Sequence, residues 1–247
     1  MRPRLVPFVV AIALACSSGV GHAQLTSTPE YQVNGLRAIL LTPAAALPQV
    51  VPAVEEGSRP YGTVAVRYGR YSFGSANYSN IAASAWANLG RFAQLGGTIG
   101  QRSCEGCEGS IMASVDLDAR LYHKEGERQS DADTDVGLEL IGGYGKAKVS
   151  DFKAAAIQAA LPVAVSLPQS NDSRLTLFVS PGIAYGRLQS ADSTIGALTR
   201  VVIGAGASLR FPGGLGAHVS GHRVITGDSP TQLGVALTWT FGARRKA

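Results

Sequence analysis

Two cysteines separated by two residues are the first side chains in the chain with evident chemical potential. Cys104 and Cys107 enclose a Glu-Gly pair, with no second cysteine pair and no histidine nearby. In an oxidising compartment such close cysteines are typical of a disulfide. A redox-active pair and half of a metal site are the alternatives. We favour a disulfide between Cys104 and Cys107 that closes a loop tip.

Three alternating aspartates look like the start of a calcium-binding loop. Asp131, Asp133 and Asp135 match its first ligand positions. The glycine expected at the sixth position is replaced by Val136, and the glutamate expected at the twelfth by Gly142. We therefore interpret the segment as a solvated acidic turn, and the sequence predicts no metal site and no cofactor.

The one cluster that suggests catalysis is His218-Val219-Ser220, followed by His222. A His-x-Ser pair on a late strand resembles the motif of the outer-membrane lipid A deacylases, in which the pair faces lipid. Here the apolar residues of the segment occupy one face, so His218, Ser220 and His222 are expected on the inward face. No carboxylate follows at a matching distance, since position 232 is Gln. We predict no enzymatic activity, and a lipid-modifying enzyme is kept as an alternative.

Other common motifs do not appear. The chain contains no Gly-rich phosphate loop, zinc signature or nucleophile elbow.

The segments that must position these groups begin with a secretory leader. Arg2 and Arg4 precede an apolar run from Leu5 to Ala15, and small residues end at Ala23. This pattern predicts a signal peptide over residues 1–23. The run is too short to span a bilayer as a helix. In an alternative interpretation, Cys16 is the acylated residue of a lipoprotein.

Charge excludes one class of partner. The formal net charge of the whole chain is +5. Five of the 22 basic residues lie in the leader or in the tail after Phe241, which leaves 17 basic against 17 acidic residues over positions 24–241. A basic field of the kind that binds nucleic acid is therefore absent.

Residues 24–60 differ from the rest of the chain. Thr28 is a suitable N-cap, Pro29 fits the first helical position, and apolar residues follow at helical spacing until Pro43. We expect a short helix or a disordered segment before the main domain.

From Tyr61 the apolar pattern changes to a period of two, which is the pattern of half-exposed strands. It predicts ten strands, at 62–71, 80–89, 92–101, 110–122, 135–145, 154–167, 174–188, 200–211, 215–225 and 232–241. Pro162 and Pro181 fall inside two of these strands, where each removes a ladder hydrogen bond. We expect β-bulges at both prolines.

The last predicted strand, Gln232 to Phe241, identifies the architecture. Leu233, Val235, Leu237, Trp239 and Phe241 alternate with small or polar residues over ten positions, the length with which a tilted strand crosses a bilayer. The strand resembles the closing strand of small bacterial outer-membrane β-barrels, which ends in an aromatic residue. The resemblance implies an all-β, antiparallel, up-and-down transmembrane barrel of about ten strands, with 8 to 12 allowed, over residues 61–241, followed by a basic tail at 242–247. It also implies outer-membrane lipid and the barrel-assembly machinery as partners, with Trp239 and Phe241 as the assembly signal.

Charged residues on the inward faces of the strands are expected to line the barrel. They are Arg67, Asp116, Asp118, Arg120, Glu139, Arg200 and Arg210. Because unpaired charges in a narrow interior are costly, we expect these arginines and carboxylates to pair and to keep the lumen closed.

These patterns favour a non-enzymatic, porin-like barrel in the Gram-negative outer membrane, with a structural, adhesive or narrow-transport role. A secreted soluble β-protein that binds an apolar ligand is a second alternative, besides the lipid-modifying enzyme.

Overall fold

The computed structural model describes residues 62–73, 76–89, 93–104, 107–124, 126, 132–147, 152–169, 172–189, 194–225 and 231–241. The predicted signal peptide, the leader with its expected helix and the basic tail lie outside the described residues. No helix in the described ranges is long and apolar enough to cross a membrane.

The described residues form an all-β, antiparallel structure, which confirms the predicted fold class. The strands are β1 (Gly62–Phe73), β2 (Ala76–Asn88), β3 (Ala93–Cys104), β4 (Cys107–Lys124), β5 (Asp133–Ala147), β6 (Phe152–Ala160), β7 (Val163–Pro168), β8 (Arg174–Gln189), β9 (Thr194–Arg210), β10 (Leu215–Val224) and β11 (Thr231–Phe241). Both β6 and β7 pair with β5 on one side and with β8 on the other, so they are two halves of one strand. The sheet therefore has ten strands.

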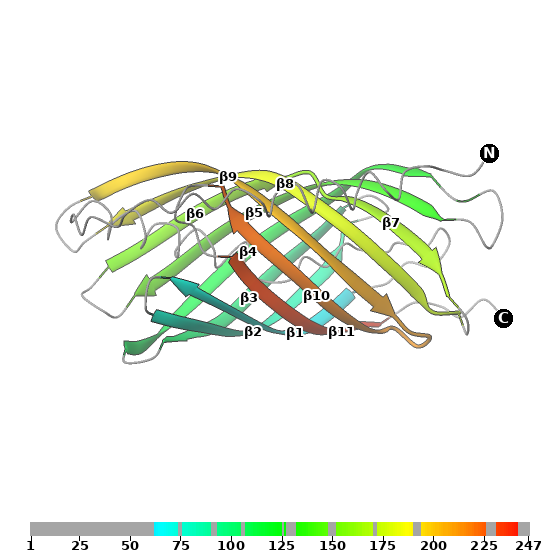
Figure 1. Cartoon of the computed structure of the whole chain (residues 1–247), viewed down its shortest axis with the longest axis horizontal. Coiled ribbons are helices and arrows are strands. Elements are labelled where there is room, and N and C mark those ends of the chain that lie inside the picture. Colours follow the sequence, from blue (N-terminus) through cyan, green and yellow to red (C-terminus); the bar gives the residue numbers. More distant parts are fainter. Residues whose placement is uncertain are drawn as a thin grey trace.

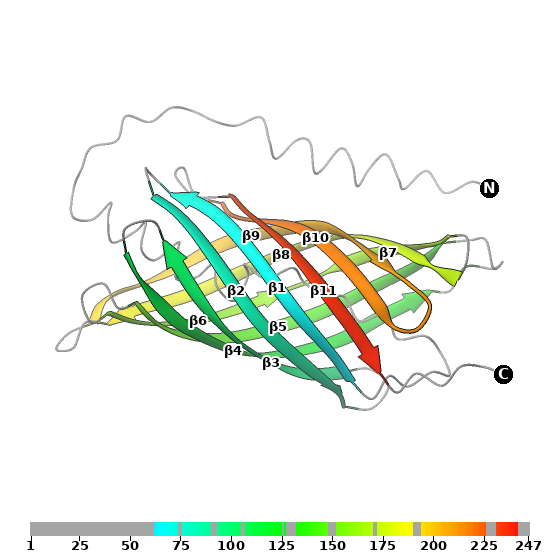
Figure 2. The same ribbon diagram turned by 90° about the horizontal axis from the view of Figure 1, so that it is seen from below.

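The sheet closes on itself. Each strand pairs with the next one along the chain, and β1 pairs with β11 from Gly62 opposite Phe241 to Tyr71 opposite Gln232. Figure 2 shows the first and last strands side by side, and Figure 1 shows the strands running obliquely around a single barrel. Closure leaves no exposed strand edge, which is the condition for a sheet to stand in lipid.

The two prolines do not produce the bulges that we expected. Gly137 N donates to Pro162 O at 2.8 Å, and Leu161 N donates to Pro181 O at 2.9 Å. The register between the β6–β7 strand and each of its neighbours is the same before and after Pro162. Each proline therefore removes one hydrogen bond of a cross-strand pair without inserting a residue, so the prediction of bulges was wrong.

A bulge occurs instead near the end of β4. Arg120 pairs with Gly137 and Tyr122 with Val136, which leaves Leu121 as an extra residue. The alternation predicted Tyr122 on the inward face, but Leu121 and Tyr122 are both exposed, and His123 becomes the residue opposite Asp135. The extra residue shifts the two-residue period by one position, and side chains beyond it exchange faces.

The turn between β9 and β10 depends on two glycines. Gly213 and Gly214 both have φ of 90°, which side chains other than glycine rarely adopt. The N–H of Phe211 donates to Leu215 O at 2.8 Å and closes the turn. Gly214 also lies so close to the backbone of Thr240 that a Cβ would collide with it. Thus the turn also fits tightly against the closing strand.

Large inward side chains lie against glycines of the neighbouring strand. Trp86 faces Gly96 on β3, and His222 faces Gly204 on β9. A Cβ on Gly204 would lie 2.7 Å from the His222 ring, and a Cβ on Gly96 would overlap the indole. Glycine at these positions leaves room inside the barrel for rings that project from the adjacent strand.

Candidate functional site: the polar lumen

Polar side chains fill the interior of the barrel. Two of the three largest fully buried side chains are Gln232 and Asn80, each with 0% of its surface exposed. Further buried polar residues come from most of the strands, and include Thr63, Ser84, Thr98, Gln158, Ser166, Thr176, Ser180, Ser220 and Thr238. Some of them bond across strands, as Ser84 and Thr98 do at 2.7 Å. The lumen is therefore the only candidate site with several kinds of hydrogen-bonding groups in the described part of the chain.

An arginine stacked on a tryptophan projects into this interior. The guanidinium carbon of Arg67 lies 4.4 Å from the centroid of the Trp86 ring, a cation–π contact. The indole Nε1–H donates to Asp116 Oδ2 at 2.5 Å. Arg67 itself is only 6% exposed, and its Nε has no hydrogen-bond partner. The contact with Trp86 therefore positions a buried positive charge beside a carboxylate.

Three carboxylates surround that arginine, and we call Asp116, Asp118 and Glu139 the central acidic cluster. Asp118 on β4 and Glu139 on β5 are direct cross-strand partners. Arg67 interacts electrostatically with all three carboxylates. Together with Arg67 on β1, the cluster brings four ionisable groups from three strands to the inside of the barrel.

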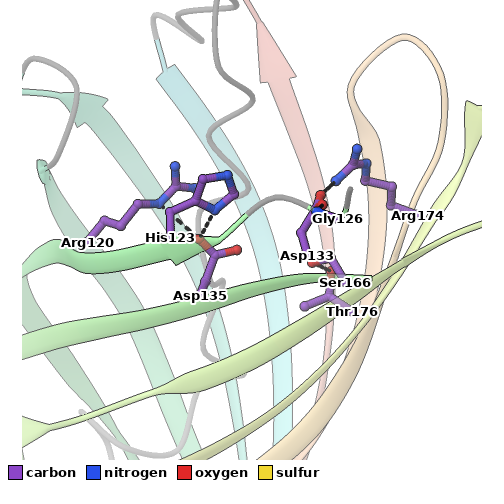
Figure 3. Close-up of polar contacts among 8 residues, drawn as sticks. All are labelled: Arg120, His123, Gly126, Asp133, Asp135, Ser166, Arg174 and Thr176. Carbon is purple, nitrogen blue, oxygen red and sulfur yellow. Dashed lines mark hydrogen bonds and ion pairs between the residues drawn. The ribbon is translucent and has the colours of Figure 1, made fainter. Parts of the chain in front are cut away.

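A second polar group, which we call the mouth network, lies where β4 ends and β5 begins (Figure 3). Arg120 Nε lies 3.1 Å from Asp135 Oδ1, and His123 Nδ1 lies 2.8 Å from the same oxygen. Nearby, Asp133 forms an ion pair with Arg174 on β8 and accepts the backbone N–H of Gly126 at 3.0 Å. Each carboxylate of this network thus has a basic partner and a second hydrogen bond.

The remaining predicted lumen charges lie on β9. Arg200 and Arg210 are both partly buried, and Arg200 Nη1 donates to the carbonyl oxygen of Thr199 at 2.9 Å. Of the residues predicted to line the lumen, the structure thus brings Arg67, Asp116, Asp118 and Glu139 together. Arg120 belongs to the separate mouth network.

The His-x-Ser segment lies on β10 with its polar side chains turned inward. Ser220 and His222 are 2% and 5% exposed, whereas Val219 between them is 53% exposed. His218 Nε2 lies 2.9 Å from Thr238 Oγ1. Among the described residues, no hydrogen bond joins His218 to a carboxylate. The described side chains therefore do not form a relay of acid, base and nucleophile.

The disulfide candidate and the predicted assembly signal lie at opposite ends of the wall. Cys104 and Cys107 are cross-strand partners where β3 meets β4, an arrangement in which Cα atoms come close enough for a disulfide. Trp239 and Phe241 point outward near the end of β11, with ring centroids 5.9 Å apart. The disulfide and the assembly signal stay predictions.

The contacts of the mouth network were not predicted from the sequence. Asp133 and Asp135 were interpreted as part of a solvated turn, although a strand was predicted to begin at Asp135. Both aspartates belong to β5, and neither His123 nor Arg174 was considered. The alternation of the two aspartates was itself a strand signal. Asp131, the first residue of the proposed calcium pattern, lies outside the described residues, and within the described ranges no three His, Cys, Asp or Glu side chains are grouped to hold a metal ion.

The outer surface has the opposite character. Exposed side chains there are mostly large and apolar, among them Val66, Ile81, Ile99, Ile111, Val115, Ile157, Val201, Leu233 and Leu237. On β11, Leu237 is 69% exposed while the adjacent Ala236 is 4% exposed. A soluble barrel reverses this distribution, because water favours a polar surface and an apolar core. The described strands thus form a closed β-barrel with an apolar outer wall and a polar interior, which is the arrangement of a membrane-spanning barrel.

Comparisons with known proteins agree with this architecture and add no activity. No protein-family model matches the barrel chain, and no curated protein is similar to it in sequence. Among solved structures it is similar to LpxR from Salmonella typhimurium (11% identity, 87% of this chain and 96% of that chain, TM-score 0.45). It is also similar to the beta domain of the Bordetella autotransporter BrkA (11% identity, 73% of this chain and 99% of that chain, TM-score 0.43). The N-terminal β-barrel domain of Pseudomonas aeruginosa OprF gives 13% identity, 74% and 99% coverage and a TM-score of 0.35.

Proposed function

We propose that this barrel resides in the outer membrane as a non-enzymatic protein with a structural or narrow-transport role. The single observation that supports this role best is the filled lumen, in which Arg67 is stacked on Trp86 among buried carboxylates. Barrels of about eight strands are just wide enough to be filled by side chains, and open aqueous channels are found at about 16 to 18 strands. Ten strands with large inward side chains therefore favour a closed or very narrow interior.

The short connections opposite the termini favour this role over adhesion. If the termini face the periplasm, as resemblance to bacterial barrels implies, the outward end carries the connections at 74–75, 105–106, 148–151, 190–193 and 225–230. Segments of two to six residues offer little surface for recognising a partner. An adhesive role therefore has less support than a structural or narrow-transport role.

A soluble ligand-binding protein and a lipid-modifying enzyme also have less support. A secreted soluble protein would carry its apolar side chains inside, contrary to the exposure of Leu237 and its equivalents. A lipid-modifying enzyme of the deacylase kind would direct a His-Ser pair toward lipid, whereas His218 and Ser220 point into the barrel.

Conductance measurements test the proposal. The purified protein in planar bilayers should show little steady conductance. Replacing both Arg67 and Trp86 by alanine should raise it, because the largest side chains near the middle of the lumen are then removed. Ile81→Ala on the lipid-facing side of β2 is the control and should leave conductance unchanged. A large, stable, ion-selective conductance of the unmodified protein would overturn the closed-lumen proposal and favour an open porin.

A further inference from the structure

Negative charge exceeds positive charge in the middle of the lumen. Arg67 is the one cation of the described residues that acts on all three carboxylates of the central acidic cluster. Arg120 and Arg174 are engaged by Asp135 and Asp133 in the mouth network. With all groups ionised, three carboxylates and one guanidinium leave two negative charges without a counter-charge.

The position of two of these carboxylates increases the repulsion. Asp118 and Glu139 stand directly opposite each other on neighbouring strands and share the inward face. Like charges in directly opposed positions of an antiparallel pair destabilise it. The repulsion is screened less inside a protein than in bulk water. A bound positive charge would relieve it.

Hydrogen-bond acceptors without partners lie in the same region. Among the described residues, Asp116 Oδ1, Glu139 Oε2 and Gln158 Oε1 have no hydrogen-bond donor, although their own residues are at least nine-tenths buried. Asp116 and Gln158 are the two cross-strand partners of Ile141, and Glu139 occupies the preceding inward position on the same strand as Ile141. Three oxygen acceptors from three consecutive strands thus have no donor among the described residues.

The chemistry of these atoms indicates the class of ligand. A ligand here needs positive charge and several N–H donors. A directly coordinated metal ion fits poorly, because the described residues contain no group of three metal-ligating side chains. A primary ammonium group carries one positive charge and three N–H donors. We propose that the central acidic cluster binds a small solute with primary ammonium groups, of which an alkyl diamine also supplies the two missing positive charges.

This inference deepens the proposed function, since it names the solute class that a narrow lumen would accept. Failure of amine binding and failure of the closed-lumen proposal can be distinguished. Amine binding is measured by thermal unfolding in detergent, whereas the closed lumen is tested by conductance in bilayers. The experiment follows the loss of the folded, faster-migrating form of the full chain on unboiled gels, with 1,4-diaminobutane or with tetramethylammonium at equal ionic strength. At a diamine concentration 100-fold above its Kd, the unfolding midpoint should rise by roughly 5–10 °C.

Substitutions in the central acidic cluster test whether the diamine binds there. Glu139→Gln and Asp118→Asn should each remove most of the diamine-induced shift, and either one that folds is sufficient for the test. Asp133→Asn in the mouth network is the matched control and should keep the shift. An equal shift with tetramethylammonium or calcium, or an unchanged shift in the cluster variants, would overturn the proposal. Absence of a shift in the unmodified protein would also overturn it.

Discussion

The central acidic cluster and the mouth network both contain carboxylates of β5, but they differ in how these carboxylates are paired. In the mouth network, Asp135 contacts Arg120 and His123 at 3.1 and 2.8 Å. In the central acidic cluster, Glu139 Oε2 has no hydrogen-bond partner, and Asp118 stands directly opposite Glu139. Buried charge is therefore paired within hydrogen-bond distance at one end of β5, and farther along the strand it is compensated only in part, by Arg67.

The backbone explains part of this difference. The extra residue at Leu121 turns His123 toward Asp135, so that a second basic group joins Arg120. In the middle of β4 the strict alternation continues, and Asp116 and Asp118 both point inward. One β-bulge thus separates carboxylates that each have a basic partner from three carboxylates that share Arg67.

The largest effect is expected from Arg67→Ala. The substitution removes the cation that acts on all three central carboxylates, together with its contact with Trp86. Removing one partner of buried charges costs about 3–5 kcal/mol, and urea unfolding in lipid vesicles measures it. Loss of less than about 1 kcal/mol, the range of exposed ion pairs, would show that the central charges are well solvated.

A charge on the outer wall should cost nearly as much. Leu237→Arg places a guanidinium in lipid, with an expected loss of about 2–4 kcal/mol if the residue lies near mid-bilayer. The neighbouring Ala236→Arg points into the polar lumen and should cost less. Gly204→Arg is a poorer control, because its side chain would strike the His222 ring. Equal losses for Leu237→Arg and Ala236→Arg would contradict the inside-out orientation.

In the mouth network, Asp135→Asn should destabilise the barrel. The variant keeps the size of the side chain but loses charge-assisted hydrogen bonds to Arg120 and His123, which contribute about 1.5–3 kcal/mol. The same unfolding assay measures it. Arg120→Ala should give a loss in the same direction, and stabilisation by either variant would show that the mouth carboxylate is not effectively paired.

In the central acidic cluster, replacing a carboxylate by its amide should stabilise the barrel instead of destabilising it. Glu139→Gln removes a like charge opposite Asp118 and should raise the unfolding free energy by about 0.2–1 kcal/mol in amine-free buffer. The pairing of lumen arginines and carboxylates that the sequence predicts would instead give a loss of stability, because Glu139 would then have an arginine partner. A loss of stability in Glu139→Gln would support that pairing and remove the contrast between the two regions.

The barrel fold and the inward or outward direction of its side chains could be predicted from the sequence, because both depend on the alternation of residues along each strand. Val235, Leu237 and Trp239 specify a lipid-facing side wherever strand β11 is placed, and the same period operates in the other strands. The inward direction of His218 and Ser220 followed from the same rule. Side-chain parity is a property of each strand alone, so a single sequence contains it.

Tertiary structure decided which charges meet. The pairing of Asp135 with His123 depends on the bulge at Leu121, and the opposition of Asp118 and Glu139 depends on the register between β4 and β5. The two prolines were predicted to cause bulges, but ladder pairing on both sides held the register. Register is fixed by contacts between strands that are distant in sequence, and a shift of one residue exchanges the faces. Outside the bulge at Leu121, the sequence therefore determined which residues are inside, and the closed sheet determined which of them are neighbours.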